Sequence, residues 1–433
     1  MLLIHFKQAW NLIGQEKLFS SLYIIGTGLS ITVVTALSIV YYIRIANIYP
    51  ETNRDRMLTV TSALEESPDG DISSSQLSYM TVETCFLPLQ EAEAVSVIYE
   101  AWGREHYVQP EGSREQLPVT VKYVNSGFWK VFDFRFLRGA PFTEADFQSG
   151  IRSAVLSESM SKRLFGAADA TGRYVSLNFM PCRVCGVVKD VSFVTETAYA
   201  QIWIPYTVDP DCKTFRFGKA GTLGSFRADI LAPSAGDREK IRNEALDNVR
   251  KLNATLPERI ELKLMGQPDR HWESIFRLNS NEAPDFTKIF LRYGLIFLVL
   301  LLIPGISLSG MTDSRMERRL SEMGIRRVFG APVSRLMGQI FSENLLFTLL
   351  GGCAGLIFSW LLILLCSDWI MTVGQGWRSI PPDGTDVVFT PAMLINIPAF
   401  LITLAVCFLL NLVTAVIPAW RASHRDLILS IKN

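Results

Sequence analysis

The stretch FSSLYIIGTGLSITVVTALSIVYYI, residues 19–43, contains no charged side chain and ends on two tyrosines followed by Arg44. A hydrocarbon layer of about 30 Å needs about 20 apolar residues in a helical segment that crosses it. This run is longer than the apolar core of a cleaved signal peptide, and no small-residue cleavage motif follows it. It therefore predicts a retained transmembrane helix whose tyrosine end lies at a membrane interface.

Three more apolar runs lie in the last third of the chain. Overall, 49% of the residues are hydrophobic and 19% are charged, whereas an ordinary soluble protein carries about 25% charged residues. The predicted fold class is a membrane protein with four transmembrane α-helices and a large extracytoplasmic α+β domain. The predicted helices are 19–43, 286–309, 337–366 and 392–417.

The short loops differ in charge, and this difference predicts the orientation. Loop 310–336 contains six arginines, whereas loop 367–391 has Arg378 alone against three aspartates. Because Lys and Arg are retained on the cytoplasmic side, we expect 310–336 and both termini in the cytoplasm. The domain 44–285 and the loop 367–391 then face outward. The cytoplasmic ends are an amphipathic N-terminal segment, 1–18, and a tail, 418–433.

The outer segment 44–285 mixes strand-like and helix-like patterns. It has 28 lysines and arginines against 33 acidic residues, which gives no reason to expect nucleic acid as a partner. The patterns predict helices at 76–86 and 158–165 and a strand at 226–231. A β-α-β pattern at each end predicts a split α+β fold that is interrupted by a mainly β insertion at about 133–205. In the second pattern, the helix 237–252 aligns four apolar residues on one face. These are Ile241, Ala245, Val249 and Leu252.

The residues of catalytic and metal sites are sparse. No phosphate-binding G-x-x-x-x-G-K-[ST] loop occurs, and His106 and His271 have no spaced partner, so both are expected to be solvated. Cys182 and Cys185 match C-x-x-C within a β-rich run, which leaves structural thiols, a disulfide or a redox or metal site open. We therefore predict no enzyme activity, catalytic residue, metal or cofactor in this chain.

Three stretches resemble one family of permeases. VNSGFWKVFDFRFLRGAPF, SAVLSESMSKRLFG and CRVCGVVKDV, within 124–191, resemble the extracytoplasmic domain of MacB-type permeases. SRMERRLSEMGIRRVFGAP, 314–332, resembles the cytoplasmic loop of the FtsX/MacB/LolC–LolE superfamily of ABC transporter permeases. The ending IPAWRA, 417–422, is similar to that superfamily's P-A-x-R-A.

The resemblance implies a permease subunit in a bacterial cytoplasmic (inner) membrane. It also implies that the two ends of the outer domain form a porter-like part and that the insertion forms a second lobe. ATP and Mg²⁺ would be bound by a separate ABC ATPase dimer, because only 18 residues precede the first span and the chain is expected to stand alone. The expected partners are that ATPase, a second permease copy (identical or different), a periplasmic adaptor or outer-membrane component, and membrane lipids. The expected work is export or extraction of a hydrophobic or amphiphilic substrate by mechanotransmission.

Two other functions stay open. The first is an FtsX-like regulatory subunit that transports nothing and activates a cell-wall hydrolase. The second is a membrane-anchored enzyme or sensor that needs no ATPase. No span carries a charge at its centre, which disfavours an ion path or a hydrophilic substrate within the bundle.

The cytoplasmic segment 317–331 is the principal candidate site. By the resemblance, a short amphipathic helix in this loop would sit in a groove of the ATPase, while a plain topology signal remains the alternative. Its arginines could pair with acidic groups or lipid phosphates, and its glycines suggest turns that a topology signal would not need. The candidate residues are Glu317, Arg318, Arg319, Leu320, Glu322, Met323, Gly324, Ile325, Arg326, Arg327, Gly330 and Ala331.

Small and helix-breaking residues mark two further positions in the spans. Gly351 and Gly355 lie four residues apart and would allow close helix packing, within the bundle or between two copies. Pro304 and Gly305, near the inner end of the second span, predict either a hinge or a plain helix break.

Overall fold

The chain divides into two compact units, each described here by itself. One contains 1–42, 286–375 and 390–433, and the other contains 43–285 and 376–389. The structure, a computed structural model, describes residues 17–100, 104–110, 112, 115–277, 282–300, 302, 333–366, 397–398, 400–409 and 412.

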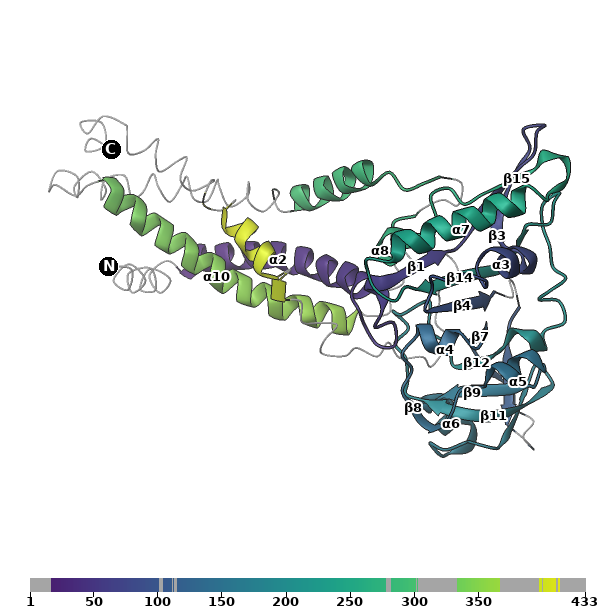
Figure 1. Ribbon diagram of the computed structural model, residues 1–433. Coiled ribbons are helices and arrows are strands. Elements are labelled where there is room, and N and C mark those ends of the chain that lie inside the picture. The colour runs from purple at the N-terminus through teal and green to yellow at the C-terminus, as the bar shows by residue number, and fades with distance from the viewer. Residues whose placement is uncertain are drawn as a thin grey trace. The chain divides into compact units, whose positions relative to one another are not determined.

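The described residues of the first unit are almost all helical (Figure 1). Helix α2 (Lys17–Ile45) and helix α10 (Val333–Leu365) are the two that are long and apolar enough to cross a membrane within the described residues. Residues 286–300 are also helical, and Phe400–Leu409 form a shorter apolar helix. The second and fourth predicted spans lie partly outside the described residues, so four transmembrane helices remain a prediction.

The second unit is built on one mixed sheet of sixteen strands within the described residues. The main path runs β15-β2-β3-β14-β4-β7-β12-β9-β11-β10-β5-β6, with β1 and β16 paired beside β14, β13 beside β3 and β8 beside β11. The strands are β1 (Met57–Val60), β2 (Ala63–Glu66), β3 (Ile72–Leu77), β4 (Ala94–Tyr99), β5 (Tyr107–Pro110), β6 (Leu117–Pro118), β7 (Val121–Val124), β8 (Phe136–Gly139), β9 (Ser153–Ser157), β10 (Tyr174–Leu177), β11 (Met180–Val188), β12 (Ile202–Pro205), β13 (Leu223–Gly224), β14 (Phe226–Leu231), β15 (Glu261–Lys263) and β16 (Asp269–Arg270).

Short helices accompany these strands. They are η1 (Arg54–Arg56), α3 (Tyr79–Cys85), α4 (Phe128–Val131), α5 (Glu144–Gln148), α6 (Glu158–Phe165), η2 (Tyr206–Val208), α7 (Arg238–Asn253), η3 (Pro257–Arg259) and α8 (His271–Ile275). Helices α3 and α7 lie side by side (Figure 1). The predicted stripe of α7 is buried, and each large apolar side chain buried in this way contributes about 1.5–3 kcal/mol.

Local signals define some elements sharply. Helix α6 occupies the residues that the sequence predicts, because Ser157 caps its N-terminus by accepting a hydrogen bond from Met160 N. Gly166, with φ of 66°, ends it in the left-handed conformation that glycine adopts at low cost. The helix predicted at 76–86 instead begins at Tyr79, because residues 72–77 extend as β3 beside β2.

The inserted region is part of the same sheet. We use "lobe" for β8, β9, β10 and β11 with α5 and α6. We use "core" for β15, β2, β3, β14 and β4, which are consecutive in the sheet, with α3 and α7. Strands β7 and β12 pair in parallel and form a neck between them. The hairpin β5–β6, which precedes the predicted insertion at 133–205, pairs with β10 and extends the lobe.

Candidate functional site

The connection between α2 and the outer domain contains several buried polar contacts. The chain leaves α2, passes through η1 and enters β1. It returns through β16 and α8 before the helical residues 286–300. Strands β1 and β16 are antiparallel, with Leu58 opposite Arg270 and Thr59 opposite Asp269. The entering and leaving segments are therefore tied together, and we call residues 43–56 with 265–277 the junction.

Arg54 caps the end of α2. Its Nη1 donates to Ile43 O at 2.6 Å and to Ala46 O at 2.7 Å, and its side chain is buried. The last carbonyls of a helix lack partners within the helix, and a cation there also interacts favourably with the helix dipole. Arg54 therefore connects the final turn of α2 to the segment that begins the outer domain.

Glu51 holds this guanidinium in place. Its Oε2 accepts from Arg54 Nε at 2.8 Å, and its Oε1 accepts from Ala198 N at 2.9 Å. Burial alone would raise the pKa of Glu51, but the charge of Arg54, followed by the hydrogen bonds from Arg54 and Ala198, lowers it below its usual value. Glu51 is thus a charged carboxylate that joins the end of α2 to the distant segment around Ala198.

His271 binds the same helix end from the returning segment. Its Nε2 lies 3.0 Å from Arg44 O, and because a carbonyl can only accept, the ring nitrogen donates. Burial, and then the nearby Arg54, lower the pKa of His271 and favour the neutral ring. The expectation that His271 is solvated is wrong: the residue is only 8% exposed, because α8 packs against η1 and β1.

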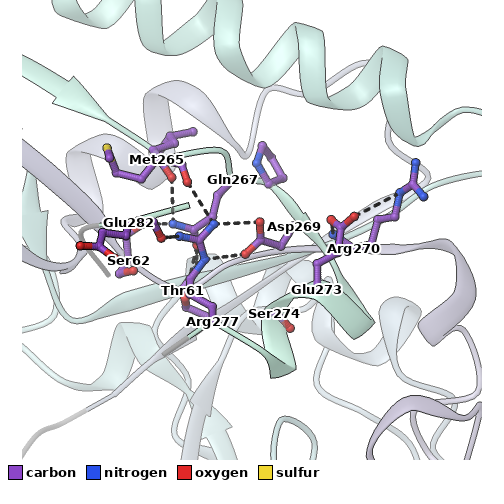
Figure 2. Close-up of polar contacts among 12 residues, drawn as sticks. Thr61, Ser62, Met265, Gln267, Asp269, Arg270, Glu273, Ser274, Arg277 and Glu282 are labelled. Carbon is purple, nitrogen blue, oxygen red and sulfur yellow. Dashed lines mark hydrogen bonds and ion pairs between the residues drawn. The ribbon is translucent and has the colours of Figure 1, made fainter. Parts of the chain in front are cut away.

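A second buried ion pair anchors the returning segment (Figure 2). Arg277 binds both carboxylate oxygens of Asp269, at 2.6 and 2.9 Å. The same guanidinium donates to Met265 O and Glu282 O. Gln267 adds a contact to the core, since its Oε1 accepts from Thr61 N at 2.8 Å. Buried polar contacts therefore also hold the returning segment to the sheet.

The helical unit contains a close seam between α2 and α10. A Cβ at Gly355 would lie 2.7 Å from Gly28 O and 2.9 Å from Ile31 Cβ. A Cβ at Gly351 would lie 3.0 Å from Thr27 Cβ. Thr32 Oγ1 spans the seam, donating to Gly28 O and approaching Gly355 O at 3.2 Å. Gly351 and Gly355 thus lie against another helix of the same chain.

The other predicted site residues fall elsewhere. The segment 317–331, together with Pro304 and Gly305, lies outside the described residues. Cys182 and Cys185 are free thiols whose pKa burial raises, to about 11 and about 12 respectively. Within the described ranges, no group of three or more His, Cys, Asp or Glu residues could hold a metal ion.

The comparisons with known proteins match both parts of the chain. The family model of the MacB-like periplasmic core domain matches residues 20–245, and that of the FtsX-like permease C-terminal region matches residues 294–427. The first match alone covers more than half of the chain. The chain belongs to the MacB/FtsX-like family of ABC transporter permeases.

Relatives of this permease include ABC permeases of bacteria. It is 25% identical over 242 residues to "Uncharacterized ABC transporter permease YknZ" of Bacillus subtilis, covering 56% of each chain. It is 25% identical over 256 residues to "Pyoverdine export ATP-binding/permease protein PvdT" of Pseudomonas aeruginosa, covering 58% of this chain and 35% of that one. The permease thus spans about half, or less, of the length of these curated relatives.

Two solved structures are also similar. The extracellular domain of YknZ matches with a TM-score of 0.33 and 20% identity, over 47% of this chain and 98% of that one. The periplasmic region of MacB from Actinobacillus actinomycetemcomitans matches with a TM-score of 0.33 and 15% identity, over 51% and 94%.

Sequence reasoning missed the junction residues. Arg54 and Glu51 follow the first span closely, and a basic residue just beyond a predicted helix end was the available signal. His271 carries no such signal, because its partner lies 227 residues away along the chain.

Proposed function

We propose that this permease is the membrane subunit of an ABC-type transporter that exports or extracts a hydrophobic or amphiphilic substrate by mechanotransmission. ATP is hydrolysed on a separate ATPase subunit that contacts the cytoplasmic loop around 317–331. Movement of α2 and the other membrane helices then passes through the junction to the extracytoplasmic domain. The protein lies in the inner membrane, with both termini cytoplasmic, and works with a second permease copy.

The observation that carries this proposal is the junction itself. A flexible tether between helix and domain would absorb a displacement of α2. Here the end of α2 is held instead by buried, charge-assisted hydrogen bonds from Arg54 and by His271. Because Glu51 and Arg54 are both almost fully buried, separating them would leave a charge without a partner, which costs several kcal/mol. These contacts support the proposal that a displacement or rotation of α2 reaches the outer domain.

Export is the favoured direction of work. A relative is named for pyoverdine export, which supports an outward direction of transport. The absence of charge from the middle of the spans supports a substrate that does not cross within the bundle as a hydrophilic solute.

The test uses the full chain in nanodiscs together with its ATPase. Trapping the ATPase with ADP and vanadate should change hydrogen exchange at junction amides and in the outer domain of the wild type. In Arg54→Met, ATP hydrolysis should persist while the change in the outer domain is lost. Arg250→Met is the matched control, because Arg250 forms only an exposed pair with Asp247. An unchanged outer-domain response in Arg54→Met would refute transmission through the junction.

A deletion strain separates export from the regulatory alternative. Under the proposal, the strain retains an amphiphilic compound or lipid that the wild type releases, as measured by comparing cell extracts with culture medium. A defect in cell separation with unchanged extracts would instead identify a subunit that activates a cell-wall hydrolase.

A further inference from the structure

Residues 46–53, which we call the linker, connect α2 to η1. The linker binds the root of the lobe, by which we mean residues 133–135 and Lys189, as well as the core. Tyr49 Oη accepts from Arg135 N at 3.1 Å and lies 3.4 Å from Lys189 O. Pro50 O accepts from Asp133 N at 2.8 Å. Residues 133–135 lead into β8, and Lys189 follows β11 directly. The two chain segments that enter and leave the lobe therefore both contact Tyr49, and the entering segment also bonds Pro50.

A third contact reaches the segment that connects the lobe to the neck. Residues 191–200, which we call the strap, run from the end of β11 to β12 without regular secondary structure. Loops of this kind usually lie at the surface, because their backbone groups need water. The strap is nevertheless buried, apart from Glu196 and Thr197.

The strap is held by a few specific bonds. Ala198 N donates to Glu51 Oε1 at 2.9 Å, and Ala198 O accepts from Trp203 Nε1 at 3.1 Å. Internal turns satisfy other backbone groups, including Thr195 N to Ser192 O. Glu51 thus bonds the strap with one oxygen and Arg54 with the other.

The pairing between core and lobe is narrow. Strands β4 and β7 pair at two positions, and β12 and β9 also pair at two. By contrast, β14 and β4 pair at six positions within the core, and β11 and β9 pair at five within the lobe. Fewer ladder hydrogen bonds resist bending on either side of the neck than within the core or the lobe.

We propose that the lobe is the part of the outer domain that α2 moves. The linker holds the root of the lobe through Tyr49, Pro50 and Glu51, and the lobe pivots about the neck formed by β7 and β12. The core, which is connected to α2 through η1 and β1, serves as the base relative to which the lobe moves. This inference rests on the proposed function, because it needs a nucleotide-driven displacement of α2.

Two substitutions test the lobe contacts, and the chain supplies a matched control for each. Ala198→Pro removes the N–H that donates to Glu51, and Tyr49→Phe removes the hydroxyl between Arg135 and Lys189. Ala220→Pro removes an equivalent bond, from Ala220 N to the buried Glu65 at 3.0 Å, far along the sheet. Tyr79→Phe removes a hydroxyl that bonds Glu83 within α3.

The measurement is the distance between spin labels on the lobe and on the core. Labels at Arg163, exposed on α6, and at Arg250, exposed on α7, are placed in a cysteine-free chain that retains ATP hydrolysis, bound to its ATPase in nanodiscs. Trapping with ADP and vanadate should shift this distance. The shift should be lost in the Ala198→Pro, Tyr49→Phe double variant and kept in the Ala220→Pro, Tyr79→Phe control.

A second label pair separates this inference from the proposed function. Labels at Arg250 of two permease copies report movement of the cores. If the core-to-core distance responds to nucleotide while the lobe-to-core distance does not, the lobe is not the moved part and the inference is wrong. If neither distance responds, transmission to the outer domain itself fails. If the control variant loses the shift as well, the effect is general loss of stability and the linker has no special role.

Discussion

Replacing Arg54 by methionine should destabilise the outer domain strongly. The Arg54 side chain is 2% exposed and that of Glu51 is 1% exposed, so the substitution leaves a buried carboxylate without its cation. It also removes the donors to Ile43 O and Ala46 O. Breaking a buried pair by removing one partner costs about 3–5 kcal/mol. For a domain of this size, such a loss corresponds to a fall of roughly 10 °C in the unfolding temperature.

The assay is a double-mutant cycle in the full chain in detergent. Unfolding of the outer domain is followed by tryptophan fluorescence for the wild type, Arg54→Met, Glu51→Gln and the double variant. The double variant should be more stable than the sum of the two single losses predicts, by about 2–3 kcal/mol, because neither buried charge is then left alone. The exposed pair Arg250–Asp247 should give no resolvable coupling.

Losses that simply add, or a loss below about 1 kcal/mol in Arg54→Met, would refute the reasoning, because removing one partner of a buried ion pair leaves the other charge uncompensated.

Three further predictions follow from the described residues and the loop. Gly355→Ala should lower the thermal stability of the full chain in detergent, because the added Cβ would lie 2.7 Å from Gly28 O. Gly338→Ala, in the same helix, should leave the stability unchanged, because its Cβ would have no atom within 4 Å. Below about pH 6.5 the outer domain should lose stability, because His271 in the unfolded chain takes up a proton that the folded residue, with its lowered pKa, resists. His271→Gln should reduce this dependence of the unfolding temperature on pH, and an unchanged dependence would contradict the prediction. Deleting 317–331 should abolish co-purification of the ATPase while the circular dichroism of the outer domain stays the same, and retained binding would exclude this loop as the contact.

The sequence by itself determined the elements that rest on local signals. Helix α6 has its cap residue, Ser157, and its terminating Gly166 within the same ten residues. Strand β14 forms at the predicted residues 226–231, and the buried stripe of α7 follows from its period. The family resemblance was also available from the sequence, because its motifs are contiguous runs of residues, and the family models confirm it.

Only the tertiary structure decided which residues join the helices to the outer domain. Glu51 and Ala198 are 147 positions apart, and Arg44 and His271 are 227 apart. The two-residue strand β16 exists because β1 pairs with it, and the burial of His271 depends on that pairing. Periodicity and capping report only on neighbours along the chain, whereas burial and the charge of a partner depend on segments brought together by the sheet. The sequence could therefore reveal the family and locally determined elements such as α6 and α7, while the junction became visible only in the folded domain.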